Sequence, residues 1–233
     1  MATYKELHGT PIEVVSSDPS NPVDGQVWYN STSNVLKGNL SYVTSWATGG
    51  TLNTARYVLA SAGTQTAGLA FGGEVPSLVD VNESYNGTSW TEVADLNTAR
   101  QELAGNGTQT SALAYGGRKP AIADEAESWN GTSWTETGNL NQARGVLTGT
   151  GIITSALAVG GDAPPLTPIF QDLTESWNGS SWTETTDLST GRHNLTGTGS
   201  YPAALASGGR TPTTVGATEE WNNGPVVATF DAS

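Results

Sequence analysis

Arginine is the residue with the clearest potential for chemistry in this sequence, because it recurs at a nearly fixed spacing. The chain has 233 residues, of which only nine are lysine or arginine. Four of the arginines follow one another in steps of 44, 44 and 48 residues: Arg56, Arg100, Arg144 and Arg192. A ring of such guanidinium groups could bind an anion. Each could instead pair with a glutamate of the same period, such as Glu83, Glu127, Glu175 or Glu219. We favour the pairing, because a residue present in every repeat most simply serves what every repeat shares, namely structure.

Tryptophan recurs with the same period, at Trp46, Trp90, Trp134 and Trp182. These indoles, with Tyr85, Trp129 and Trp177, could form stacking platforms for sugar rings. The alternative is a core between neighbouring sheets, since one buried aromatic side chain removes roughly 150–250 Å² from water. We favour the core for the same reason as for the arginines, because the residue type stands at one position of each repeat.

Other catalytic chemistry has few candidate residues. The chain has no cysteine and two histidines, which excludes a disulfide, a thiol nucleophile and a multi-histidine metal centre. A Ser-His-Asp triad lacks a suitable base, and the aspartates do not follow the spacing of a calcium loop. We therefore expect no catalytic residues, no metal, no cofactor and no enzymatic activity.

The charge balance excludes further classes of partner. The chain carries 22 acidic residues and a net charge of −13, while only 13% of its residues are charged. This field repels a phosphate backbone and anionic lipid, so we expect neither nucleic-acid binding nor membrane docking. The uncharged segment 145–161 is too short and too polar to span a bilayer. The first ten residues also lack the apolar region of a secretory signal.

The elements that must position these residues come from an internal repeat. Four repeats lie near 52–95, 96–139, 140–187 and 188–233. In the first repeat we predict strands at 57–65, 66–71, 81–85 and 88–93, with Gly72-Gly73 ending the second strand at positive φ. Asn86-Gly87 predicts a two-residue mirror-image hairpin turn between the last two strands. Four short antiparallel strands in about 44 residues are typical of a propeller blade.

The segments GLAFGG and ESYNGTSWTEVADLNTAR resemble the kelch repeat, with apolar residues, a glycine pair, an aromatic-Asn turn, a tryptophan and a final arginine. The resemblance extends over about 180 residues and implies a β-propeller like the central domain of galactose oxidase. The copper-radical chemistry of that enzyme is not implied, because it needs a cysteine cross-linked to tyrosine together with histidine ligands. The fold predicted is thus all-β and kelch-like, and it implies no function by itself.

The number of blades follows from counting, and we predict five blades of four antiparallel strands. Residues 25–233 are assigned to the propeller and residues 1–24 to an N-terminal arm. Trp28 and Trp46 extend the repeat upstream, and 12–16 falls near the phase of a first strand, so this arm could close the fifth blade. Four blades with a free arm are the alternative.

The N-terminal segment GQVWYNSTSN resembles the opening of virion structural proteins from phages that infect marine bacteria. This resemblance implies a non-enzymatic component of a capsid or tail, located in the virion and part of a multimeric assembly. Its partners would be other virion proteins. A lectin-type propeller that binds a host-surface glycan is the alternative, and a cellular protein-interaction module is a third.

Function is expected where the repeats differ, which is in the arm, in the longer loop 162–174 and at Arg118-Lys119. Apolar side chains in the arm and loop would have to be buried or offered to a partner. The candidate partner-binding residues are Tyr4, Leu7, Ile12, Val14, Val15, Ile169 and Phe170. We expect residues 1–11 to dock on a partner, by adding a strand to a neighbouring sheet.

Overall fold

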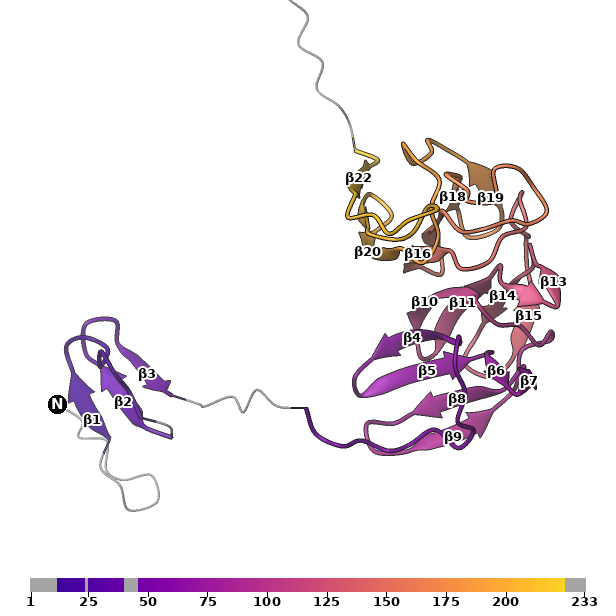
Figure 1. Ribbon diagram of the computed structural model, residues 1–233. Helices are drawn as coiled ribbons and strands as arrows, with labels where there is room; N and C mark the ends of the chain where they lie inside the picture. The colour runs from indigo at the N-terminus through magenta and orange to yellow at the C-terminus, as the bar shows by residue number, and fades with distance from the viewer. Residues whose placement is uncertain (1–11, 24, 40–45, 225–233) are drawn as a thin grey trace, which may run out of the picture. The chain divides into compact units, whose positions relative to one another are not determined.

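The computed structural model describes residues 12–23, 25–39 and 46–224, and these residues form strands and no helix (Figure 1). The described residues therefore contain no helix long and apolar enough to cross a membrane. The chain divides into two compact units, residues 1–48 and residues 49–233. The predicted boundary after residue 24 falls inside the first unit, between two strands that pair with each other. The predicted all-β class is confirmed.

The first unit is a three-stranded sheet in the order β1-β2-β3. Its strands are β1 (Glu13–Val15), β2 (Val27–Asn30) and β3 (Val35–Gly38). β1 lies parallel to β2, whereas β2 and β3 form an antiparallel hairpin. The strand in segment 12–16 therefore pairs with the segment that contains Trp28. This pairing is parallel, whereas all strands of the predicted propeller blade would be antiparallel.

Asp18 holds this small sheet together from the loop after β1. Its carboxylate accepts hydrogen bonds from Trp28 Nε1 at 3.1 Å and from Asn30 Nδ2 at 2.8 Å, and it pairs with Lys37 Nζ at 2.6 Å. Trp28 and Asn30 are buried. These contacts, led by the hydrogen bond from Lys37, lower the pKa of Asp18 to about 2. One carboxylate thus links all three strands of a unit too small to bury a large core.

The second unit contains four sheets that follow the four repeats. Each of the first three sheets has four antiparallel strands in sequence order, and the fourth sheet has three described strands. The first sheet comprises β4 (Ala60–Thr64), β5 (Ala67–Phe71), β8 (Asn82–Tyr85) and β9 (Trp90–Val93). The second comprises β10 (Ala104–Thr108), β11 (Ser111–Tyr115), β14 (Ala126–Trp129) and β15 (Trp134–Glu136). The third comprises β16 (Thr148–Ile152), β17 (Ser155–Val159), β18 (Thr174–Trp177) and β19 (Trp182–Glu184). The fourth comprises β20 (Thr196–Ser200), β21 (Ala203–Ser207) and β22 (Thr218–Asn222).

The four strands predicted for the first repeat are all present, with bounds that are shorter by up to three residues at their ends. Sequence reasoning missed two small two-stranded hairpins, one in the first repeat and one in the second. They are β6 (Glu74–Val75) with β7 (Ser77–Leu78), and β12 (Arg118–Lys119) with β13 (Ala121–Ile122). The glycine pair has the predicted backbone, with φ of 68° at Gly72 and 109° at Gly73.

The predicted two-residue hairpin turn at Asn86-Gly87 is wrong. Tyr85 pairs directly with Trp90, so the loop contains four residues, and among them only Gly87 has a positive φ. The Asn86 side-chain oxygen accepts the backbone N–H groups of Thr88 and Ser89, at 3.0 and 2.9 Å. The asparagine therefore closes a wider loop through its side chain.

Consecutive sheets of the second unit lie side by side through their first strands, β4 with β10, β10 with β16 and β16 with β20 (Figure 1). Among the described residues no comparable contact joins β20 to β4. The arrangement is propeller-like, but the ring is not closed. With the sheet of the first unit there are five sheets of three or four strands, of which the four in the second unit are antiparallel throughout.

Candidate functional site

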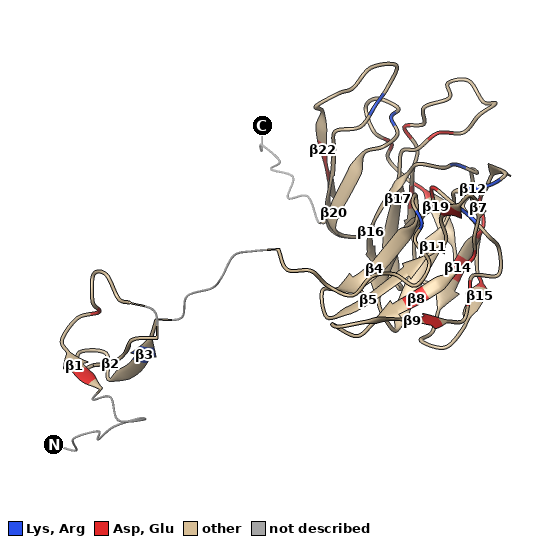
Figure 2. Ribbon diagram, turned by 60° about the horizontal axis from the view of Figure 1, so that its bottom comes forward, with Lys and Arg blue, Asp and Glu red and all other residues tan. Residues whose placement is uncertain are grey.

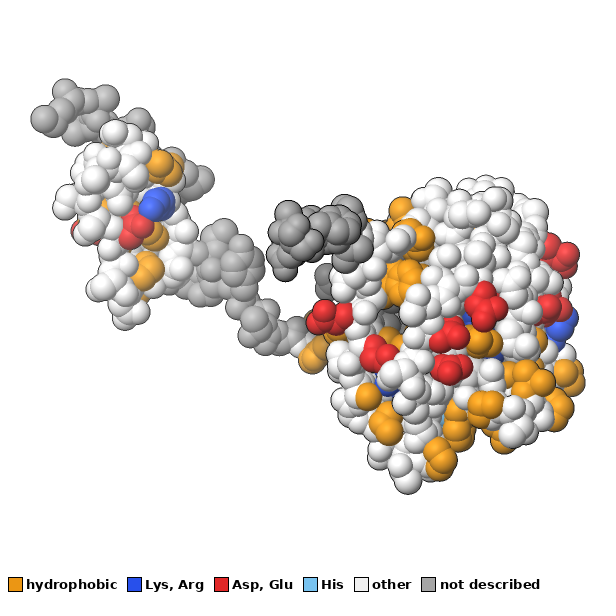
Figure 3. Space-filling view, turned by 90° about the horizontal axis from the view of Figure 1, so that it is seen from above, with side chains coloured by type: hydrophobic (Ala, Val, Ile, Leu, Met, Phe, Trp, Pro, Cys, Tyr) orange, Lys and Arg blue, Asp and Glu red, His pale blue; other side chains and the backbone are white. Residues whose placement is uncertain are grey.

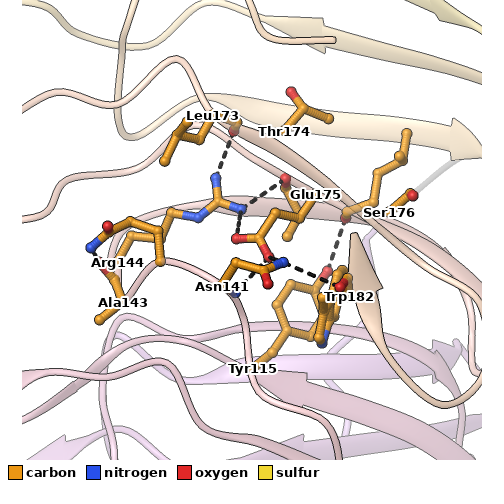
Figure 4. A network of polar contacts seen from close by, with 12 residues as sticks. Tyr115, Asn141, Ala143, Arg144, Leu173, Thr174, Glu175, Ser176 and Trp182 are labelled. Carbon is orange, nitrogen blue, oxygen red and sulfur yellow. Dashed lines mark hydrogen bonds and ion pairs between the residues drawn. The ribbon is translucent and has the colours of Figure 1, made fainter. Parts of the chain in front are cut away.

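The recurring arginines form buried polar nodes, which Figure 4 shows for Arg144. Its guanidinium donates from Nη1 to the carbonyl oxygens of Gly160 and Leu173, at 3.0 and 2.6 Å. From Nη2 it pairs with Glu175 Oε1 at 2.9 Å. The other oxygen of Glu175 accepts the backbone and side-chain N–H groups of Asn141, at 2.7 and 2.8 Å. Asn141 Nδ2 also donates to the Trp182 carbonyl oxygen at 3.2 Å. One node thus connects three strands and the segment that enters the repeat.

Arg100 with Glu127 and Arg56 with Glu83 repeat this arrangement, at 2.8 and 2.6 Å. In all three nodes the side chains of both partners are at most 1% exposed. Burial lowers the pKa of Arg100, and the neighbouring Glu127 counteracts this effect. Burial raises the pKa of Glu83, but the Asn53 amide and Arg56 outweigh it, so the pKa is lowered overall. The guanidinium charges are neutralised internally, and none of these three faces solvent to bind an anion.

The arginines also join consecutive sheets through their backbone. In the first three repeats the second glycine of the pair donates its N–H to the carbonyl oxygen of the arginine in the next repeat, for example from Gly73 to Arg100 at 2.8 Å and from Gly117 to Arg144 at 3.0 Å. A Cβ on Gly117 would lie 2.6 Å from the Gln101 carbonyl oxygen, so the close approach requires glycine. Side chain and backbone of one arginine therefore fix a sheet and its neighbour together.

The node of the fourth repeat is incomplete. Arg192 Nη2 lies 3.1 Å from Glu219 Oε1, but the Glu219 side chain is 26% exposed, and Arg192 Nη1 has no hydrogen-bond partner among the described residues. Ser189 stands where the other repeats have asparagine, and only its backbone N–H reaches Glu219, at 2.8 Å. A carbonyl oxygen of the fourth strand completes the other nodes, and the described residues of this repeat contain no fourth strand.

The recurring tryptophans differ in their surroundings from one repeat to the next. Trp134 and Trp182 are each 5% exposed. They pack on an aromatic ring of the preceding repeat, Trp134 on Phe71 with ring centroids 4.9 Å apart and Trp182 on Tyr115 at 4.7 Å. Trp90 is half-buried at the end of the array, and Trp46 is fully exposed. The predicted core position thus describes two of the four indoles.

A cleft lies between the third and fourth sheets, whereas a fourth-strand tryptophan fills each of the two preceding interfaces. Its volume is about 100 Å³. Its apolar walls are formed by Leu157, Val159, Leu188, Ala204, Ala206 and Trp221. The equivalent residues around Trp182 form one closed cluster: Leu113, Tyr115, Leu140, Ala156, Ala158 and Trp177. The cleft is therefore the position of a missing tryptophan, because its walls match those of an occupied one residue by residue.

Charged residues alternate along one rim of the array. Equivalent positions in the four repeats carry Glu74, Arg118, Asp162 and Arg210. Each of these residues forms a β-bridge with the residue that follows the recurring arginine of its own repeat. Arg118 pairs with Glu102 and, across the boundary between repeats, with Asp162 at 2.6 Å. Lys119 pairs with Glu125. The basic pair predicted as a candidate for function is thus engaged with acidic neighbours, and Figure 2 shows the charged positions along the strands.

A depression on the inner side of the array is formed by residues that sequence reasoning did not single out. Val58, Glu102, Val146 and Asn194 all have φ between 51° and 56°. Each of the last three donates its N–H to the carbonyl oxygen of the preceding one, at 2.9, 2.9 and 3.1 Å, which links the four repeats in series. Together with the leucines that follow them they line a hollow of about 310 Å³. In the sequence, the only sign of this hollow is the leucine that stands three residues after each recurring arginine.

The candidate partner-binding residues lie in two places. In the first unit Val14 is 61% exposed on β1, and Ile12 and Val15 are half-buried. In the loop 162–174 Ile169 is exposed, whereas Phe170 stacks on His193 with ring centroids 4.8 Å apart. Tyr4 and Leu7, like the proposed docking segment 1–11, lie outside the described residues. On the face of the second unit that Figure 3 shows, hydrophobic side chains form separate small groups among polar ones.

The part of the chain that the structure describes contains no cluster of three or more residues able to hold a metal ion. No family model matches this chain, and no curated protein matches it. The class that the fold defines is that of all-β proteins with blade-like sheets in a propeller-like array.

Proposed function

We propose that this chain is a structural protein of a bacteriophage particle, in which a kelch-like array of sheets acts as a non-enzymatic scaffold. Its partners are other virion proteins or a host surface. The observation that carries the proposal is the burial of the residues that could have done chemistry. The arginines and glutamates of the first three repeats hold the sheets together, which supports a scaffolding role for the array.

The first unit supports an anchoring role. Its sheet is small and held by Asp18, and it exposes apolar side chains on all three strands, including Val14, Val27 and Leu36. Exposed apolar groups on so small a sheet offer area to a partner. The resemblance of the segment 25–34 to the opening of virion proteins agrees with this role.

The experiment is mass spectrometry of purified particles from the phage that encodes the chain. We expect the protein at a fixed copy number per particle, and its absence from particles would overturn the proposal. Deletion of Met1–Gly9 is expected to leave the melting temperature nearly unchanged and to abolish incorporation. Normal incorporation of the truncated protein would exclude the arm as the anchor.

A second candidate function, glycan binding, has an observation of its own. At the free end of the array Tyr85 and Trp90 lie with ring centroids 4.9 Å apart and line a shallow hollow of about 510 Å³. Polar side chains of Ser61, Gln65 and Asn106 surround them. Aromatic faces beside hydrogen-bonding groups suit a sugar ring.

A glycan array separates the two candidates. If the hollow binds sugar, wild-type protein labels defined glycans and Trp90→Ala loses this signal. Ile152→Ala, which removes an exposed apolar side chain outside the hollow, serves as the control and should bind as the wild type does. An array without signal for the wild type would reject glycan binding and leave the scaffold proposal standing.

A further inference from the structure

In the described residues the fourth sheet has three strands, whereas each of the other three sheets of the second unit has four. β22 is its outermost described strand, whereas β9, β15 and β19 complete the others. The cleft beside β22 has the walls of an occupied tryptophan position, and its apolar lining is half-exposed at Ala204 and Trp221. An apolar cleft next to an unpaired strand edge is a docking site for a further strand.

The chain contains one tryptophan that fits this position by its spacing. Trp46 precedes Leu52 by six residues, as Trp90 precedes Leu96 and Trp182 precedes Leu188. Trp46 follows Thr-Ser, as Trp90 does. Its indole is fully exposed, and among the described residues no side chain takes the tryptophan position in the cleft.

The connection after each fourth strand explains how the two could meet. In the array, the chain that leaves a fourth strand passes the hairpin loop of the next sheet. There Gly138 lies so close to Ser180 that a Cβ on Gly138 would be 2.7 Å from the Ser180 carbonyl oxygen. Gly50 makes the same approach to Thr88 of the first sheet. A first sheet stacked on a fourth sheet would therefore bring its own Trp46 to the vacant position.

The alternating rim charges agree with this stacking. Arg118 of the second repeat pairs with Asp162 of the third at 2.6 Å. Arg210 of the fourth repeat and Glu74 of the first end the series with opposite signs, and among the described residues neither forms an ion pair. If a first sheet followed a fourth sheet, Arg210 and Glu74 would face each other as Arg118 and Asp162 do.

We propose that copies of this chain associate head to tail, with the first sheet of one copy stacked on the fourth sheet of another. Trp46 of the first copy fills the cleft of the second, and its Glu74 pairs with Arg210 of the second. Such a heterologous contact can close into a ring or continue as a filament. The inference rests on the proposed function, because it names the partner of the scaffold's open edge.

The test is the mass of the purified full chain, measured by light scattering after size exclusion over a range of concentrations. We expect multimers for the wild type. For Trp46→Ala we expect a dissociation constant at least about thirtyfold higher, which is the effect of losing a central aromatic contact. Ala204→Phe, which fills the cleft, should also give monomers. A mixture of the two variants should form a dimer, because Trp46→Ala keeps the cleft and Ala204→Phe keeps the indole.

Charge reversal provides a second measurement that does not depend on folding of the cleft. Glu74→Arg or Arg210→Glu alone should weaken association, and the double variant should restore it. A monomeric wild type overturns the inference, whether Trp46 is then exposed or buried within its own chain. Multimers whose mass is unchanged in Trp46→Ala overturn it as well. Because incorporation into particles is measured separately, the proposed function can stand if this inference fails.

Discussion

Arginine suits the recurring node because its planar guanidinium donates several hydrogen bonds in fixed directions. Arg100 donates to Gly116 O, Glu125 O and Glu127 Oε1 at once, and a lysine ammonium could not reach this fork-shaped set of acceptors. The node therefore combines an ion pair with hydrogen bonds to two backbone carbonyl oxygens. This explains why a sequence with so few basic residues retains arginine at the same place in every repeat.

We expect Arg100→Ala to lower the free energy of unfolding by about 3 kcal/mol, because it leaves the Glu127 carboxylate buried without its partner. Urea denaturation followed by tryptophan fluorescence measures this loss. Arg192→Ala is the matched control, since its node is partly open and already lacks partners, and its loss should be clearly smaller. Equal losses at the two positions would contradict the account of the nodes.

The Asp18 carboxylate should make the first unit sensitive to acid. Its pKa is lowered from 3.8 to about 2 in the folded sheet, so its stabilising effect is fully present above pH 3.8 and is lost as the pH falls through about 2. We expect the indole N–H signal of Trp28 in NMR spectra to keep its folded position at pH 5 and to lose it progressively between about pH 4 and 2. Asp18→Asn should remove this pH dependence, and an unchanged transition in that variant would assign it to another group.

At the scale of the elements, the loop between the third and fourth strands shows how a side chain can decide a turn. Asn130 Oδ1 accepts the backbone N–H groups of Thr132 and Ser133, both at 2.9 Å. Asn130→Ala should cost about 1 kcal/mol of unfolding free energy, since two amides lose their acceptor while solvent can replace part of it. Asn130→Asp keeps an acceptor and should stay close to the wild type in thermal denaturation. A variant with alanine as stable as the wild type would show that Gly131 alone determines the loop.

The elements that the sequence predicts well are those with a repeated pattern. The strands of the first repeat, the glycine pair and the arginine–glutamate pairing all follow from spacing, because the same constraint appears four times. The hairpins β6–β7 and β12–β13 could not be predicted, since two-residue strands leave no alternation of apolar and polar residues. The parallel pairing of β1 with β2 also has no signal in so short a strand.

At the scale of the whole molecule, the sequence does not determine how the array ends. A period shows how many equivalent sheets there are, but closure depends on which segment supplies the last strand. The fourth repeat has lost its tryptophan, the asparagine of its node is Ser189, and the matching Trp46 lies at the other end of the array. These changes become meaningful only once the structure shows an empty cleft with the walls of an occupied one.

The central claim is that the open edge of the fourth sheet is completed by another copy of the chain. Amide hydrogen exchange at low and high protein concentration tests it most directly. The account predicts that β22 (Thr218–Asn222) and the residues Trp46–Gly50 exchange rapidly in dilute solution and become protected together as the concentration rises, while β11 stays protected throughout. Exchange of β22 and Trp46–Gly50 that does not depend on concentration would contradict the account.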